Sequence, residues 1–144
     1  MTEFRWVTAD FAVAPQLDLA DIARAAKAGF KTLIKNRPEA EEPGQIKEFE
    51  VQATALAAGL DYRALPFTGP PPPAAVAAMA ELLEQAPGPV LAYCRSGMRS
   101  ILAWGMAQAL TGARRPNEII ALAAKAGYDL EGKREPLEAL APPV

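Results

Sequence analysis

Short apolar segments of strand length alternate along this chain with longer Ala-rich segments of helix length, and this alternation constrains the fold more than any other feature. The segments with strand character are residues 11–14, 31–35, 62–67 and 89–93. The segments with helix character are residues 18–28, 46–58, 74–85, 100–110 and 116–126, and an irregular tail follows the last of them. This alternation predicts a three-layer α/β domain in which helices flank a central, mostly parallel sheet. We expect residues 1–144 to form this single domain, because the chain is too short for a second one.

Residues that favour helix ends lie at the boundaries of these segments. Asp18, followed three residues later by Asp21, is a plausible cap for the N-terminus of the first helix. Gly29 and Gly59 stand where the C-terminal caps of the first two helices are expected. Prolines fill positions 70–73 between a predicted strand and a predicted helix, and we interpret them as a stiff turn rather than as a polyproline ligand.

Two residue counts exclude many kinds of chemistry. The chain has no histidine, and imidazole is the usual general base and metal ligand near neutral pH, so Ser-His-Asp and Cys-His hydrolases are excluded. The single cysteine, Cys94, rules out an internal disulfide, a CxxC redox pair and a zinc site with two thiolates. We therefore expect an intracellular, cytoplasmic protein with no metal site and no cofactor.

The charge balance and the hydropathy pattern exclude two kinds of partner. Lysine and arginine together number 15 and aspartate and glutamate 17, so the chain has no excess of positive charge to attract nucleic acid or anionic lipid. No apolar run reaches the length of a signal peptide or of a membrane-spanning helix. The sequence therefore predicts neither a nucleic-acid nor a membrane partner, and it does not predict an oligomeric state.

The segment with the most chemical information follows the predicted strand at 89–93 and leads into the next helix. It reads Cys94-Arg95-Ser96-Gly97-Met98-Arg99-Ser100. Small residues and a glycine let successive backbone N–H groups turn inward, the helix N-terminus adds partial positive charge, and Arg99 can bind two oxygens. The segment therefore predicts an anion-binding loop, and the expected ligand is a small anionic substrate.

Cys94 is a candidate nucleophile at the start of this loop. A thiol held at a helix N-terminus beside arginines is stabilised as the thiolate, which is the reactive form. The alternative interpretation is a cysteine packed at the end of an apolar strand, which is the commoner fate of a lone cysteine. Two arginines, two serines and a glycine follow within six residues, and a packed thiol needs none of them. We therefore prefer the functional interpretation.

The loop from Cys94 to Arg99 resembles the active loop of cysteine phosphatases and of rhodanese sulfurtransferases, two families that form a covalent cysteine intermediate. The whole chain also resembles the phosphatase-like domain family named after beta-lactamase hydrolase-like proteins. The matching stretches are residues 15–17, 28–30, 36–38, 42–45, 58–60 and 65–67, the loop at Cys94, and residues 126–130. This resemblance implies a fold similar to that of dual-specificity phosphatases, with Cys94 as the nucleophile and Arg99 as the group that holds the oxyanion.

Three features differ from the ordinary phosphatase pattern. Tyr93 stands where phosphatases usually have a histidine. Cys94 and Arg99 are separated by four residues, which is the spacing of many rhodaneses, whereas phosphatases have five. Residues 68–70 read Thr-Gly-Pro, in a neighbourhood where dual-specificity enzymes can carry the aspartate that protonates the leaving group.

An acidic loop could supply the missing general acid. Glu39, Glu41 or Glu42 could serve if this loop folds over the anion-binding loop, although three carboxylates in four residues more usually mark a solvated turn. Arg37 ends a strand that we expect in the same sheet as the Cys94 strand, so its side chain could face the same crevice. Arg37, Glu39 and residues 44–46 also resemble, faintly, a rhodanese segment that usually contains a histidine.

Three functions are compatible with these features. The first is a phosphatase-like hydrolase that acts on a phosphate monoester or similar anion through a covalent Cys94 intermediate. The second is a rhodanese-type sulfurtransferase that carries sulfane sulfur as a Cys94 persulfide from a sulfur donor to an acceptor. The third is a non-catalytic anion-binding module that kept the loop without a general acid. The sequence favours the first, because the phosphatase-like resemblance covers nearly the whole chain whereas the rhodanese match is local.

Overall fold

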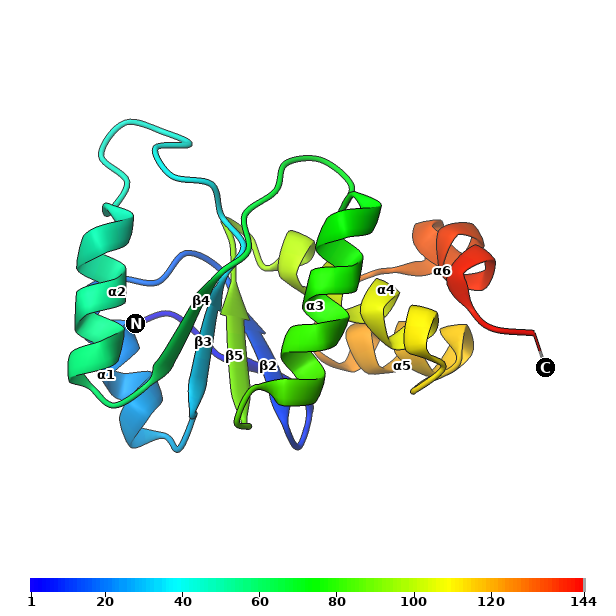
Figure 1. The fold of residues 1–144 in the computed structure, drawn as a ribbon, viewed down its shortest axis with the longest axis horizontal. Helices are drawn as coiled ribbons and strands as arrows, with labels where there is room; N and C mark the ends of the chain where they lie inside the picture. The colour runs from blue at the N-terminus through cyan, green and yellow to red at the C-terminus, as the bar shows by residue number, and fades with distance from the viewer. Residues whose placement is uncertain (144) are drawn as a thin grey trace.

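A five-stranded sheet forms the centre of the computed structural model, which describes residues 1–143 (Figure 1). Its strands are β1 (Arg5–Thr8), β2 (Phe11–Ala14), β3 (Thr32–Lys35), β4 (Asp61–Ala64) and β5 (Val90–Tyr93). They are arranged in the order β1-β2-β5-β3-β4. β1 pairs antiparallel with β2, and the other three pairings are parallel. The prediction of a mostly parallel central sheet is therefore confirmed.

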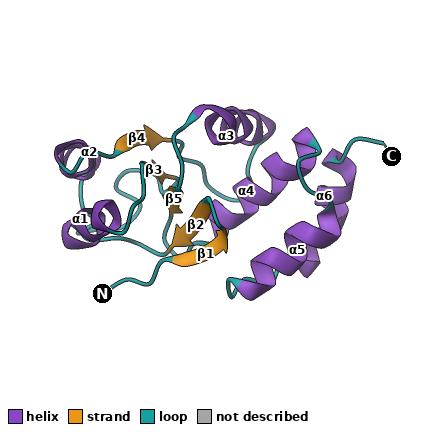
Figure 2. Ribbon diagram, turned by 90° about the horizontal axis from the view of Figure 1, so that it is seen from below, coloured by secondary structure: helices purple, strands orange, loops and turns teal. Residues whose placement is uncertain are grey.

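Helices cover both faces of this sheet. They are α1 (Leu19–Lys27), α2 (Glu48–Ala57), α3 (Pro73–Gln85), α4 (Met98–Thr111), α5 (Pro116–Lys125) and α6 (Arg134–Leu140), with a short 3-10 turn η1 (Glu131–Lys133) before α6. Figure 2 shows α1 and α2 on one side of the sheet and the other helices on the opposite side. This confirms the predicted three-layer arrangement. Within residues 1–143, no helix combines the length and the apolar character needed to cross a bilayer.

The three inner strands β2, β3 and β5 are buried on both faces, and alternate residues of the central strand β5 belong to different cores. In β5, Val90 and Ala92 pack with the α3, α4 and α5 side, whereas Leu91 and Tyr93 pack with the α1 and α2 side. All four are buried, and side chains of a strand point to opposite faces in turn. Burial on both faces explains why β5 is a continuous apolar run rather than an alternating one.

The predicted caps of the first helix are present. The Asp18 carboxylate accepts the backbone N–H of Asp21, and the Asp21 carboxylate accepts the backbone N–H of Asp18, which together form a capping box. Gly29, directly after α1, has a φ of +103°, a conformation that favours glycine. These local signals were sufficient to locate the helix because they act over only a few residues.

Several element boundaries differ from the sequence predictions. The strand predicted at 62–67 ends at Ala64, and α4 begins at Met98 rather than near Ser100 because Gly97 forms its N-terminal cap. Leu110, expected in the core, is 39% exposed near the end of α4. Met106, also expected in the core, is only partly buried.

Three elements, β1, η1 and α6, were not predicted at all. β1 is an edge strand in which only Val7 is buried, so its four residues carry almost no hydrophobic pattern. The prediction of an irregular tail after α5 is wrong, because η1 and α6 follow it. α6 has seven residues and buries only Leu137, which packs in the same core as α4. β1 and α6 thus form through tertiary contacts rather than through local periodicity.

Candidate active site

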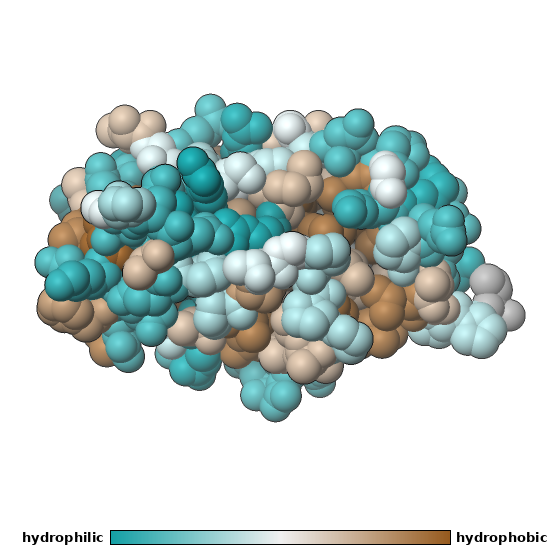
Figure 3. Space-filling view, turned by 90° about the horizontal axis from the view of Figure 1, so that it is seen from above, coloured by the Kyte–Doolittle hydropathy of each residue, from teal (hydrophilic) through white to brown (hydrophobic). Residues whose placement is uncertain are grey.

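The candidate site lies at the edge of the sheet where the parallel strands end. Tyr93, the last residue of β5, is level with Ala14 of β2 and Lys35 of β3, so the loops that follow these three strands meet. The backbone of Gln16 donates a hydrogen bond to the Arg95 carbonyl (3.1 Å), and that of Asn36 donates to the Tyr93 carbonyl (2.9 Å). Ligands of open α/β sheets bind beyond these strand ends. The face of the molecule above this edge is largely hydrophilic (Figure 3).

Cys94 directly follows β5 and is fully buried. Its Sγ accepts a hydrogen bond from the backbone N–H of Gly97 at 3.1 Å. The turn that makes this contact possible needs the φ of +96° that Gly97 adopts, which other residues rarely tolerate. The thiol therefore lies inside the turn that precedes α4, next to a backbone N–H group at a helix N-terminus.

The remaining residues of the predicted anion-binding loop have different environments. Ser96 Oγ accepts the backbone N–H of Met98, the first residue of α4, at 3.2 Å, and Gly97 between them is the N-cap. Arg95 is exposed and its Nη2 lies 3.5 Å from Glu42 Oε2. Ser100 is buried and donates to Asn36 Oδ1 (2.8 Å), which ties α4 to the end of β3. The hydroxyl of Ser100 is thus buried and committed to Asn36.

Arg99 connects the loop to the acidic segment. Its Nη2 and Nη1 donate to the two carboxylate oxygens of Glu41 at 2.7 Å and 2.8 Å, and Nη1 also donates to the Phe67 carbonyl at 3.1 Å. The hydrogen bonds that Arg99 donates to Glu41 raise the pKa of Arg99, and the charge of the Cys94 sulfur adds to this shift. Arg99 therefore lies within electrostatic range of the thiol, while Glu41 accepts hydrogen bonds from both of its terminal nitrogens.

Glu41 lies between two arginines. Besides Arg99, the Nε of Arg37 donates to Glu41 Oε1 at 2.8 Å, and Arg37 Nη1 donates to Gln16 Oε1 at 2.9 Å. The hydrogen bonds from Arg99, followed by those from Arg37, lower the pKa of Glu41 to about 2. The acidic loop does fold over the candidate site, but a carboxylate with this pKa is ionised at neutral pH and has no proton to donate. The two hydrogen bonds that Glu41 accepts from Arg99 instead fix the orientation of the Arg99 guanidinium.

Of the other two glutamates of the loop, Glu39 contacts the start of α2 and Glu42 shares Arg37 with Glu41. Glu39 accepts the backbone N–H of Glu48 at 2.9 Å and 3.0 Å, so it caps the N-terminus of α2. Glu42 lies 3.3 Å from Arg37 Nη2 and extends toward Arg95. Arg37 itself is 1% exposed, so the loop closes over it.

Three residues that contact the loop escaped sequence reasoning. Gln16 accepts a hydrogen bond from Arg37, and Asn36 accepts one from Ser100. The Tyr128 hydroxyl donates to the Ser96 carbonyl at 2.9 Å. Tyr128 lies after α5, 32 residues from its partner, and no local motif connects the two. Its stretch, 126–130, belongs to the family resemblance, which was the one signal that pointed to it.

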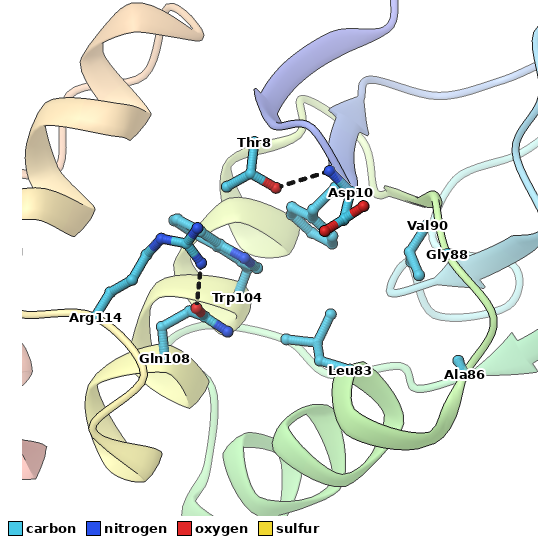
Figure 4. Close-up of a pocket in the computed structure, with 10 residues that line it drawn as sticks. Thr8, Asp10, Leu83, Ala86, Gly88, Val90, Trp104, Gln108 and Arg114 are labelled. Atoms are coloured by element: carbon cyan, nitrogen blue, oxygen red, sulfur yellow. Dashed lines mark hydrogen bonds between the residues drawn. The ribbon is translucent and has the colours of Figure 1, made fainter.

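A separate pocket of about 370 Å³ lies at the opposite end of β5. Figure 4 shows the residues around it, among them Asp10, Trp104, Gln108 and Arg114. Gly88 and Val90, which line it, come at or before the start of β5, whereas Cys94 follows its end. Within the described part of the chain, no group of three or more His, Cys, Asp or Glu residues could hold a metal ion.

Comparisons with known proteins agree with this architecture. The sequence profile described as "Beta-lactamase hydrolase-like protein, phosphatase-like domain" matches residues 3–111. A beta-lactamase hydrolase-like protein of Agrobacterium fabrum is 34% identical over 119 residues, which are 82% of this chain and 28% of that protein. The chain thus spans less than a third of the length of the curated relatives that it matches.

Solved structures show the same fold. A provisionally assigned phosphatase of Neisseria meningitidis is 36% identical, with a TM-score of 0.82 over 94% of this chain and 96% of that one. A kinase-associated phosphatase, crystallised with serine in place of its catalytic-site cysteine, has a TM-score of 0.74 over 93% of this chain and 89% of its own. It is only 14% identical, so it shows a phosphatase-like fold and nothing about the reaction.

Proposed function

Because the chain belongs to the phosphatase-like domain family of beta-lactamase hydrolase-like proteins, we propose that it is a cysteine-dependent, phosphatase-like hydrolase. The substrate would be a phosphate monoester or a similar small anion. One observation carries the role of the cysteine: Cys94 Sγ accepts the Gly97 N–H at 3.1 Å at the start of α4, within electrostatic range of Arg99. This combination of thiol, backbone N–H and guanidinium is suited to a nucleophile that attacks an anion.

The proposed reaction has two steps. The Cys94 thiolate attacks phosphorus, an S–P bond forms, the P–O bond to the leaving group breaks, and the leaving oxygen takes a proton from water. A water molecule then attacks the phosphorus, the S–P bond breaks, and inorganic phosphate leaves as the thiolate is regenerated and a proton passes to solvent. The Gly97 N–H and Arg99 would stabilise the charge that develops on the phosphoryl oxygens.

The chain offers little assistance to a poor leaving group. Residues 68–70, which follow β4, contain no carboxylate, and Glu41 is ionised at neutral pH. Esters with good leaving groups need less proton donation in the transition state. We therefore expect aryl phosphates to be hydrolysed faster than alkyl phosphates.

A second candidate is sulfur transfer, favoured by the four residues between Cys94 and Arg99. A short loop encloses a small pocket, which suits one sulfur atom carried on the cysteine. With thiosulfate as donor, the Cys94 thiolate would attack the outer sulfur, a new S–S bond would form, and sulfite would leave with the electron pair of the old S–S bond. A thiol or cyanide acceptor would then take the sulfur and return the thiolate.

Two measurements separate these candidates, and the single cysteine makes both of them specific. The first is hydrolysis of an aryl phosphate by the wild type and by Cys94→Ser, which should lose turnover because serine is a far weaker nucleophile here. The second is the intact mass of the reduced protein after exposure to thiosulfate. Hydrolysis that is lost in Cys94→Ser supports the phosphatase, and a gain of one sulfur that cyanide removes supports the sulfurtransferase.

The same variant tests whether the site is catalytic at all. Binding of inorganic phosphate to the wild type and to Cys94→Ser can be followed by isothermal titration. An anion-binding module without catalysis would bind phosphate equally in both proteins and show neither turnover nor sulfur uptake. Turnover that persists in Cys94→Ser would refute both enzymatic proposals.

A further inference from the structure

The peptide group between Ser96 and Gly97 is hydrogen-bonded at both ends. Its N–H donates to Cys94 Sγ at 3.1 Å, and its carbonyl oxygen accepts the Tyr128 hydroxyl at 2.9 Å. A trans peptide is planar, and its N–H and C=O point in opposite directions. A hydrogen bond that fixes the carbonyl on the outside of the loop therefore also aims the N–H at the sulfur on the inside.

Tyr128 is itself held firmly against the loop. The residue is 8% exposed, and the Arg5 guanidinium lies over its ring at 5.4 Å from the centroid. Arg5 also donates to the carbonyl of Ala126, two residues before the tyrosine, at 3.4 Å. The Tyr128 hydroxyl lies directly against Gly97 of the loop, because a Cβ added at Gly97 would lie only 2.0 Å from the hydroxyl oxygen. The hydroxyl thus occupies the space that the missing side chain of Gly97 leaves.

The tyrosine has the protonation state that this contact requires. Burial raises the pKa of Tyr128, Arg5 opposes that shift, and the Cys94 sulfur adds to it. The phenol therefore remains a donor at neutral pH. Donation to the Ser96 carbonyl also polarises the peptide, which strengthens the N–H as a donor to the sulfur.

From this geometry we propose that Tyr128 is a positioning residue of the Cys94 loop. Its hydroxyl holds the Ser96–Gly97 peptide so that the Gly97 N–H faces the Cys94 thiolate and, during turnover, the oxygens of the bound anion. Tyr128 lies beyond residues 3–111, the part that matches the family profile, so the C-terminal segment contributes to the site. The part of the proposal that concerns turnover rests on the proposed function, whereas the contact with the thiolate does not.

Tyr128→Phe removes only the hydroxyl and is the informative variant. Tyr62→Phe is a matched control, because Tyr62 is also 8% exposed and its hydroxyl donates to Glu48 Oε1 at 3.3 Å. The first readout is alkylation of Cys94 by iodoacetamide, measured as the ratio of the rates at near-neutral and alkaline pH. A misdirected N–H stabilises the thiolate less, so we expect this ratio to fall about threefold or more in Tyr128→Phe and to stay at the wild-type value in Tyr62→Phe.

The second readout is hydrolysis of an aryl phosphate. We expect kcat to fall about tenfold in Tyr128→Phe with little change in KM, because the loss of orientation affects the transition state more than the bound substrate. Unchanged alkylation in a folded Tyr128→Phe protein would overturn the proposal, as would an equal change in Tyr62→Phe. If the wild type hydrolyses no phosphate ester, the proposed function fails while the alkylation ratio still decides the role of Tyr128.

Discussion

Replacement of Glu41 by glutamine should destabilise the protein by an amount that depends on pH. The Glu41 carboxylate accepts hydrogen bonds from Arg99 at 2.7 Å and 2.8 Å and from Arg37 at 2.8 Å. Glutamine keeps the length of the side chain and one acceptor oxygen but removes the negative charge. Arg37, which is 1% exposed, would then lose its principal counter-charge.

The pKa of Glu41 gives the magnitude. It falls from 4.5 to about 2 in the folded protein, mainly because of the hydrogen bonds from Arg99. One pKa unit corresponds to about 1.4 kcal/mol, so ionised Glu41 contributes at most about 3 kcal/mol to the free energy of unfolding. The side chains of Glu41 and Arg99 are 23% and 19% exposed, and screening by solvent reduces this to about 1–2 kcal/mol.

The direction of the pH dependence follows from the lowered pKa. The folded state holds the ionised carboxylate more strongly than the unfolded chain does, so the contribution is complete above the ordinary value of 4.5. It is lost as the pH falls from 4.5 toward about 2. Urea unfolding of the wild type and Glu41→Gln across this range measures the difference, which should be about 1–2 kcal/mol at neutral pH and shrink as the solution is acidified.

Glu42→Gln is the matched control for this experiment. Glu42 is in the same loop, but its side chain is 45% exposed and its nearest arginine nitrogens lie at 3.3 Å and 3.5 Å. We expect this substitution to change the free energy of unfolding by less than about 0.5 kcal/mol. A destabilisation of Glu41→Gln that is constant across the pH range, or one that Glu42→Gln reproduces, would refute the assignment to the ionised Glu41 carboxylate.

Two further substitutions test the framework around the site. Ser100→Ala removes the donor to Asn36 Oδ1 and leaves a buried acceptor with one partner fewer. The free energy of unfolding, measured in urea, should therefore fall by about 1–3 kcal/mol. A change below about 0.5 kcal/mol would contradict this expectation. Gly105→Ala would place a Cβ 2.9 Å from Ile119 Cγ2, and we expect a net loss of about 1–2 kcal/mol despite the better helix propensity of alanine. The double variant with Ile119→Ala should be less destabilised than the sum of the two single variants.

Much of the framework could be predicted from local sequence. β5 is a continuous apolar run, α1 is marked by Asp18 and Gly29, and both signals act within a few residues. The alternation of strands and helices then indicated a layered, mostly parallel sheet. β1 and α6 escaped prediction because each buries a single residue, so neither has a hydrophobic period from which it could be recognised.

The candidate site likewise has one part that local sequence predicts and another part that it does not. The loop from Cys94 to Arg99 was predictable from local sequence, because a strand end, a glycine turn and a helix N-terminus are contiguous in the chain. In contrast, Glu41 pairs with Arg99 across 58 residues and Tyr128 contacts Ser96 across 32, and both contacts became known only from the three-dimensional fold. Such contacts depend on the strand order and on helix packing, which bring distant residues together at one edge of the sheet, and no local propensity specifies them.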